Sequence, residues 1–129
     1  MSEPNTPVNV YKALIDQLVD ETRLLGSSAH VAKNGFFSKA PAHSEFNDFI
    51  KSLSPQERQL LSQMLQEERD STIHDVLAAL TWWVTAHEVD LVFKGKSMPI
   101  DLSGMGLHGD FVGRKDGWEW PERNDGNTA

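Results

Sequence analysis

The sequence contains no cysteine among its 129 residues, which excludes disulfide scaffolds and cysteine-ligated zinc or iron–sulfur sites. Any metal ion would therefore need histidine and carboxylate ligands. Basic residues are also scarce, with 12 Lys and Arg against 19 Asp and Glu and a net charge of -7. Because they stand singly or in pairs, they form no cluster that would displace counterions from phosphate. We expect no nucleic acid as a partner.

Long apolar runs are missing as well. The longest nearly apolar stretch, residues 76–86, is too short to cross a bilayer and predicts a buried helix, so we expect no membrane partner. Residues 1–7 carry neither the basic nor the apolar part of a secretion signal, and the expected location is the cytoplasm. A chain of this length and 39% hydrophobic content suits one core. We predict a single domain over residues 1–129.

Helix signals dominate residues 7–87. Thr6 followed by Pro7 is a typical helix start, and apolar residues then recur at helical spacing to about Leu25, with Gly26 as the predicted stop. Residues 27–41 are small and polar and are predicted to form a loop. A short amphipathic helix is predicted to begin at Ser44.

The tetrad from Ser54 to Glu57 has the pattern of a capping box, which predicts a new helix there. Whether residues 55–87 form one helix or two stays open, because residues 70–72 could end one helix and cap another. One apolar stripe along the whole stretch favours a single helix; its members are Leu61, Leu65, Val76, Leu80 and Trp83.

After His87 the apolar residues alternate with polar ones, which predicts two short strands. A two-residue turn at Gly95-Lys96 would pair Phe93 with Met98, Leu91 with Ile100 and Val89 with Leu102, giving one apolar face. Pro99 and the facing pair Asp90 and Asp101 count against this hairpin.

These signals together predict a mainly α fold. Its helices, within residues 7–87, form a small bundle around one central apolar helix. Residues 88–121 add a hairpin and an irregular glycine-rich segment packed on the bundle, and residues 1–6 and 122–129 are predicted to be disordered.

The spacing of Gly104, Gly106 and Gly109 fits a dinucleotide-binding fingerprint. That motif needs a helix whose N-terminus, at the third glycine, binds the pyrophosphate. Because Gly113, Gly117 and Pro121 follow, we expect no such helix and interpret the glycines as a series of turns.

His74 and Asp75 form the adjacent pair that resembles the signature of the HD phosphohydrolases. The resemblance implies a divalent metal ion that activates water for attack on a phosphoester, with His43 upstream and Asp90 or Asp101 downstream as further ligands. The polar residues 67–72 precede the pair here, whereas an apolar helix usually does so in that family. The alternative interpretation, without a metal site, is a solvated helix face on which Asp70 and His74 form an ion pair.

The glycine-punctuated C-terminal segment holds a second set of candidate residues, predicted to bind a small-molecule ligand: His108, Asp110, Arg114, Trp118 and Trp120. In an extended chain the two Trp side chains face the same way and can stack on a sugar or base, while Arg114 can hold an anion. The alternative, which we favour, is that the Trp residues tie the segment to the helices.

Trp82 and Trp83 cannot both enter one core, because neighbours on a helix diverge by about 100°. One of them is predicted to lie at an interface, and a homodimer is the partner we expect. No complete catalytic set is visible, so the leading hypothesis is a non-enzymatic protein that acts through protein contacts. No cofactor is predicted; the alternatives are a hydrolase with a divalent metal ion, and a small-molecule binder.

Overall fold

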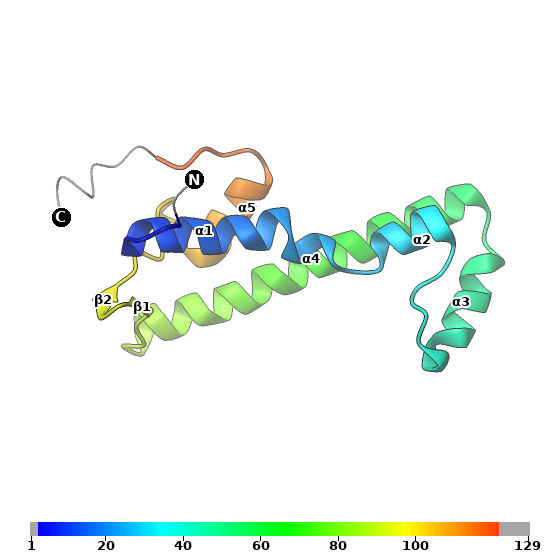
Figure 1. The fold of residues 1–129 in the computed structure, drawn as a ribbon, viewed down its shortest axis with the longest axis horizontal. Coiled ribbons are helices and arrows are strands. Elements are labelled where there is room, and N and C mark those ends of the chain that lie inside the picture. The colour runs from blue at the N-terminus through cyan, green and yellow to red at the C-terminus, as the bar shows by residue number, and fades with distance from the viewer. Residues whose placement is uncertain (1–2, 122–129) are drawn as a thin grey trace. The chain divides into compact units, whose positions relative to one another are not determined.

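The computed structural model describes residues 3–121 and shows the predicted mainly helical fold with one small antiparallel hairpin (Figure 1). Most of the termini predicted to be disordered lie outside the described residues. The elements are α1 (Pro7–Asp20), a 3-10 turn (Thr22–Leu24), α2 (Ser28–Asn34), a second 3-10 turn (Pro41–His43), α3 (Ser44–Lys51), α4 (Pro55–Ala86), β1 (Val92–Phe93), β2 (Lys96–Ser97) and α5 (Gly106–Lys115).

The chain divides into two compact units. The first unit contains α1, the part of α4 from Ile73 onward, the hairpin and α5; the second runs from Thr22 to Thr72. Helix α4 contributes residues to both units. In the part of the chain that is described, no helix is long and apolar enough to cross a membrane.

Helix α1 begins as predicted, with the Thr6 hydroxyl oxygen accepting the Asn9 N–H at 3.3 Å. It ends at Asp20, however, and a 3-10 turn follows, so the stop predicted at Gly26 is wrong. The helix buries Tyr11 and Ile15, which lie one turn apart on the same side.

Helix α4 answers the question of one helix or two, because it runs unbroken through 32 residues. The predicted capping box is confirmed: Glu57 N–H donates to the Ser54 hydroxyl at 3.1 Å and the Glu57 carboxylate accepts the Ser54 N–H at 2.8 Å. The predicted apolar stripe is wrong for two members, since Val76 is 62% and Trp83 49% exposed. The buried residues of α4 are instead Ser62, Asp70 and Leu77, so two of the three side chains that this helix buries are polar.

Residues 28–34 form helix α2 and not the predicted loop. Gly35 ends the helix in the left-handed conformation, with φ of 72°, which glycine adopts without strain. The helix is held to α4 by polar contacts, because the Ser28 hydroxyl donates to the Ser62 carbonyl at 2.9 Å and the Ser62 hydroxyl to the Ser28 carbonyl at 2.7 Å. Val31 is the single buried residue of this helix, so its sequence shows no apolar stripe.

The second unit also contains a buried ion pair, between Arg23 and Asp70, where a solvent-exposed helix face was predicted. Asp70 is only 9% exposed and accepts two hydrogen bonds from Arg23, at 2.9 and 3.1 Å. The Gln66 amide donates to the same carboxylate at 2.9 Å. The predicted solvated face with an Asp70–His74 pair is therefore wrong at Asp70.

The hairpin exists but its turn lies one residue earlier than predicted. Lys94 and Gly95 both have positive φ, as a type I′ turn requires, and the pairs are Val92 with Ser97 and Phe93 with Lys96. The partner of Phe93 thus differs by two residues from the predicted Met98. Each strand contains only two residues, so the predicted pairs of Leu91 with Ile100 and of Val89 with Leu102 are wrong as well.

The first unit has one apolar core shared by α1, α4 and α5. Its buried members are Tyr11, Ile15, Val19, Leu77, Leu107 and Phe111. Residues of the connection before α5 pack against this core, among them Ile100 and Leu102. The glycine-rich segment is therefore ordered around a helix, and the prediction of an irregular segment is wrong for residues 106–115.

Candidate functional site

A pocket of about 460 Å³ lies between α4 and α5 in the first unit. It lies at the join between the helical region and the C-terminal segment. Helix α4 contributes one residue and the segment from 103 to 118 contributes the rest: His74, Ser103, Met105, His108, Gly109, Val112, Gly113 and Trp118. His74 from the predicted metal set thus shares a pocket with His108 and Trp118 from the predicted ligand set.

The two histidines of the pocket form a close pair. The ring centres of His74 and His108 are 5.1 Å apart and the rings are perpendicular. Nδ1 of His74 lies 3.1 Å from a carboxylate oxygen of Asp75, and the His74 side chain is 40% exposed. The two adjacent residues His74 and Asp75 therefore interact with each other.

Thr81 positions His108 against α4. Its hydroxyl donates to the Leu77 carbonyl at 2.8 Å, accepts the Leu107 N–H at 3.1 Å, and lies 3.4 Å from Nδ1 of His108. The side of the imidazole that carries Nδ1 also lies against Gly106, where a Cβ would be only 2.8 Å from Cε1. The absence of a side chain at Gly106 is thus required for this placement.

Asp110, predicted as a ligand-binding residue, lies beneath the pocket with no exposed surface. Its carboxylate accepts the Leu102 and Ser103 N–H groups at 2.9 and 2.7 Å, and it also accepts the hydroxyl of Tyr11. Burial, with the bonded and charged Asp110 carboxylate as a further cause, raises the pKa of Tyr11 well above its ordinary value. Asp110 therefore holds the pocket wall at Ser103 and has no contact with the pocket itself.

Arg114 and Trp120, also predicted to bind a ligand, are occupied by a structural contact. Arg114 donates to both carboxylate oxygens of Asp16, at 2.7 and 3.3 Å, and to the Trp118 carbonyl at 2.7 Å. The Trp120 indole N–H donates to Asp16 at 3.0 Å and its ring packs against Tyr11. The packing interpretation of these residues is the one that the contacts support.

The five predicted metal ligands are divided between the two units. His43 belongs to the second unit, where its ring stacks on Phe46, whereas the other four belong to the first unit. There, the Asp90 carboxylate accepts the Ser97 hydroxyl at 2.6 Å and the Asp101 carboxylate accepts the Gly106 N–H at 2.8 Å. Within residues 3–121, no three His, Asp or Glu side chains are grouped so that they could hold one metal ion.

The two tryptophans of α4 are both exposed, Trp82 by 53% and Trp83 by 49%. Their ring centres are 5.1 Å apart, and the exposed ring of His87 lies 4.2 Å from Trp82 and 4.7 Å from Trp83. His87 thus lies on the exposed surface beside both tryptophans. These three residues are called the aromatic patch below.

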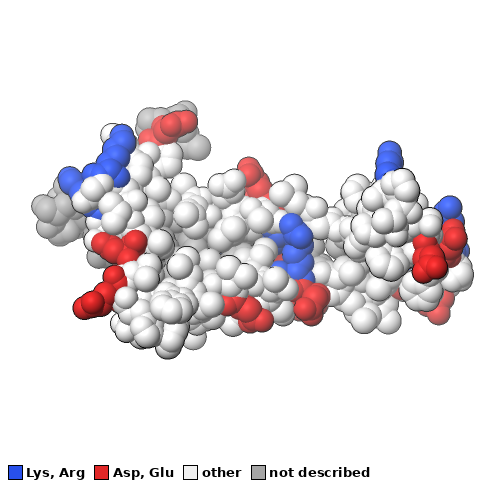
Figure 2. All heavy atoms as spheres, turned by 90° about the horizontal axis from the view of Figure 1, so that it is seen from below, with Lys and Arg blue, Asp and Glu red and all other residues white. Residues whose placement is uncertain are grey.

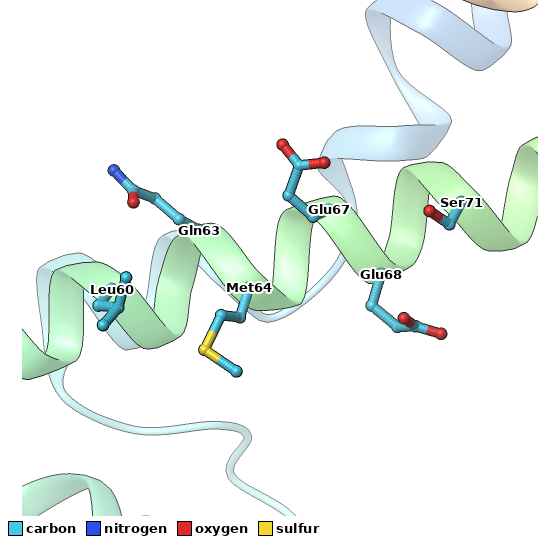
Figure 3. Close-up of a pocket in the computed structure, with 6 residues that line it drawn as sticks. All are labelled: Leu60, Gln63, Met64, Glu67, Glu68 and Ser71. Atoms are coloured by element: carbon cyan, nitrogen blue, oxygen red, sulfur yellow. The ribbon is translucent and has the colours of Figure 1, made fainter.

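In the second unit, the outer side of α4 carries a shallow depression of about 690 Å³. Figure 3 shows its lining residues along this one helix, with Leu60 and Met64 among polar side chains. Leu60 is 58% and Met64 59% exposed. Because only one helix lines it, the depression cannot enclose a small molecule as ligand pockets do.

Only three of the eight pocket residues, His74, His108 and Trp118, were predicted as site residues. The sequence reasoning missed the others, which are Ser103, Met105, Gly109, Val112 and Gly113. Ser103 carried no local signal, because the Asp110 carboxylate that binds its N–H stands seven residues later, whereas an Asp side chain in a turn binds the backbone two residues on. Met105 carried none, because it is an apolar residue in a stretch predicted to be irregular.

Comparison with known proteins gives a family without an assigned activity. Residues 4–122 match the family described as "Family of unknown function (DUF6547)". The chain belongs to this family. Neither the search of curated proteins nor that of solved structures gives a match.

Proposed function

We propose that this member of the DUF6547 family is a non-enzymatic protein that acts through protein contacts and forms a homodimer through the aromatic patch. The observation that carries the proposal is the exposure of about half of each indole of Trp82 and Trp83 on a regular helix. Tryptophan is among the residues most enriched at interface centres, and its burial there contributes more to affinity than that of most other side chains.

A second copy of the chain is the partner that the patch suits. A twofold dimer brings the same surface of both copies together, so this surface must not repel itself. Trp82, Trp83 and His87 carry no formal charge when the imidazole is neutral, so two such patches meet without like-charge repulsion. Figure 2 shows one face of the molecule, where charged side chains lie in small separate groups among uncharged surface.

The exposed area limits how tight such a dimer is. Two half-exposed indoles supply about 200 Å² of surface, against roughly 800 Å² per partner in a stable interface. Neighbouring exposed residues such as Val76, which is 62% exposed, must supply the remainder. We therefore expect a dimer with a dissociation constant in the micromolar range.

Sedimentation equilibrium over a wide concentration range tests the proposal. The wild-type chain is expected to shift from monomer to dimer, and Trp82→Ala with Trp83→Ala is expected to raise the dissociation constant by about 30-fold or more. The control is Leu25→Ala, which alters a side chain that is 75% exposed in the second unit and should leave the equilibrium unchanged. A wild-type chain that stays monomeric throughout would refute the homodimer.

Binding of a small ligand in the pocket between α4 and α5 is a second candidate, supported by the Trp118 side chain in its lining. Tryptophan fluorescence against a ligand library tests it. A Trp118→Ala variant that retained a ligand's affinity would remove the pocket as the binding site.

A further inference from the structure

The hydrogen bonds of His74 determine which of its ring nitrogens is free. Its Nδ1 lies 3.1 Å from a carboxylate oxygen of Asp75. An ionised carboxylate can only accept, so Nδ1 carries the hydrogen. The neutral ring then presents the lone pair of Nε2.

His108 is fixed in the same tautomer by a different acceptor. The single hydroxyl hydrogen of Thr81 is donated to the Leu77 carbonyl at 2.8 Å. Its oxygen can therefore only accept at the 3.4 Å contact with His108, so Nδ1 of His108 is the donor. Nε2 of this ring also keeps its lone pair.

This pattern is typical of histidines that bind metal ions. Such histidines coordinate through one nitrogen while the other donates to a carboxylate or another oxygen, which fixes the tautomer and the ring orientation. Here Asp75 and Thr81 supply the two outer contacts.

The separation of the rings agrees with a shared ion. Two imidazoles on a tetrahedral ion, each with Nε2 about 2.0–2.1 Å from the metal, have ring centres roughly 5 Å apart. The ring centres of His74 and His108 are 5.1 Å apart. Both rings line the same open pocket, together with the hydroxyl-bearing Ser103.

We propose that His74 and His108 form a binding site for a divalent transition-metal ion such as Zn²⁺ or Cu²⁺, coordinated by both Nε2 atoms. Imidazole suits these ions, whereas Mg²⁺ and Ca²⁺ require oxygen ligands. Two protein ligands leave coordination positions for water or for Ser103, so the ion is exchangeable and accessible from the pocket. The site differs from the one implied by the HD resemblance, because it uses His108 and places Asp75 behind His74.

Calorimetric titration of the full chain, without a histidine tag and freed of metal by a chelator, tests the site with Zn²⁺ alone. We expect one equivalent to bind, and His74→Gln and His108→Gln each to weaken binding by about tenfold or more. The matched controls are His30→Gln and His43→Gln, which remove histidines that line neither the pocket nor the aromatic patch. Absence of binding by the wild-type chain, or binding by both pocket variants as tight as that of the wild type, would overturn the proposal.

A second measurement needs no variant at all. Substoichiometric Cu²⁺ broadens the NMR signals of the side chains that bind it. The imidazole signals of His74 and His108 should disappear first among the five histidines. Earlier loss of His30, His43 or His87 signals would show that the ion binds elsewhere and would equally overturn the site.

Variants of Thr81 test whether its contact with His108 positions the imidazole for metal binding. Thr81→Val keeps the shape of the side chain but removes the acceptor for His108, and Thr81→Ser restores it. We expect the valine variant to bind Zn²⁺ about tenfold more weakly and the serine variant to recover wild-type affinity. Equal affinities of these variants would refute the positioning role of Thr81.

Discussion

Tyr11 of α1 donates its hydroxyl hydrogen to the carboxylate of Asp110 on α5, and neither side chain has any exposed surface. The same carboxylate accepts the N–H groups of Leu102 and Ser103. One buried acid thus joins the first helix, the last helix and the loop that lines the pocket. Its negative charge is tolerated in the core because three donors surround it.

Tyr11→Phe removes one donor and leaves the other contacts in place. We expect the free energy of unfolding to fall by about 1–3 kcal/mol, because the buried Asp110 loses a hydrogen bond that water cannot replace. Asp110→Asn should cost more, since either orientation of its amide would place an N–H donor against a backbone N–H, that of Leu102 or that of Ser103. Urea unfolding measures both variants. Asp48→Asn, on the exposed surface of α3, is the control and should have little effect.

The raised pKa of Tyr11 predicts a loss of stability in alkaline solution. Below its ordinary pKa of 10.0 the tyrosine is protonated in both folded and unfolded chains, so its contribution is constant. Above pH 10 the unfolded chain releases the proton while the folded chain keeps it, and the free energy of unfolding falls by up to about 1.4 kcal/mol per pH unit.

Tyr11 is the sole tyrosine of the chain, which makes this prediction easy to measure. The ultraviolet absorbance of tyrosinate should appear only as the protein unfolds, and Tyr11→Phe should show a shallower decline of stability above pH 10. Appearance of tyrosinate near pH 10 in a chain still folded by circular dichroism would contradict the buried contact.

The starts of two helices, which depend on residues close together in the sequence, were predicted correctly. The Thr6 cap and the Ser54 to Glu57 capping box each depend on residues within three positions of one another, so their spacing carries the whole signal. The continuity of α4 was favoured by an apolar stripe, two members of which, Val76 and Trp83, are exposed. The helix nevertheless runs unbroken, and no Gly or Pro interrupts residues 56–86.

Helix α5 shows what local sequence could not predict. Gly109 and Gly113 lie in its interior, and each disfavours a helix by about 1 kcal/mol relative to alanine. The helix forms because tertiary packing outweighs that preference: Trp118 lies against Gly113, and Leu107 and Phe111 are buried in the core. None of these contacts can be seen in the sequence without the fold.

The two histidines of the candidate site were assigned to different predicted sites for the same reason. His74 and His108 stand 34 positions apart and belonged to two separate hypotheses, one for a metal and one for an organic ligand. Only the packing of α5 on α4 brings them into one pocket. Because α5 itself was not predicted, their proximity could not be.

Gly109→Ala tests the close packing of α5 against the pocket wall. In an ordinary helix this substitution stabilises by up to about 1 kcal/mol. Here a Cβ would overlap Met105 Cβ and lie 3.2 Å from the Ser103 hydroxyl. We expect the free energy of unfolding to fall by about 1–3 kcal/mol instead.

Gly113→Ala is the matched comparison on the same helix. Its Cβ would meet the ring of Trp118 at 3.2 Å, a side chain near the end of the described chain that can yield. We therefore expect a smaller loss than at Gly109, measured by thermal melting of both variants. A Gly109→Ala variant more stable than the wild type would show that Met105 does not pack where the structure places it.

Asp16 anchors the C-terminal segment, and its removal should release that segment. Its carboxylate accepts two hydrogen bonds from Arg114 and one from the Trp120 indole at 3.0 Å, in a half-buried setting. Asp16→Ala should lower the free energy of unfolding by about 1–3 kcal/mol, because both partners lose a charged acceptor. The effect should persist in high salt, which screens exposed charges far more than partly buried ones.

Arg114→Lys tests the geometry separately, since lysine keeps the charge but cannot reach both oxygens as the guanidinium does. If the bidentate contact matters, the lysine variant will lose stability and show the Trp120 fluorescence shifted towards that of exposed tryptophan. Unchanged stability in both variants would mean that Trp120 is held by its packing on Tyr11 alone.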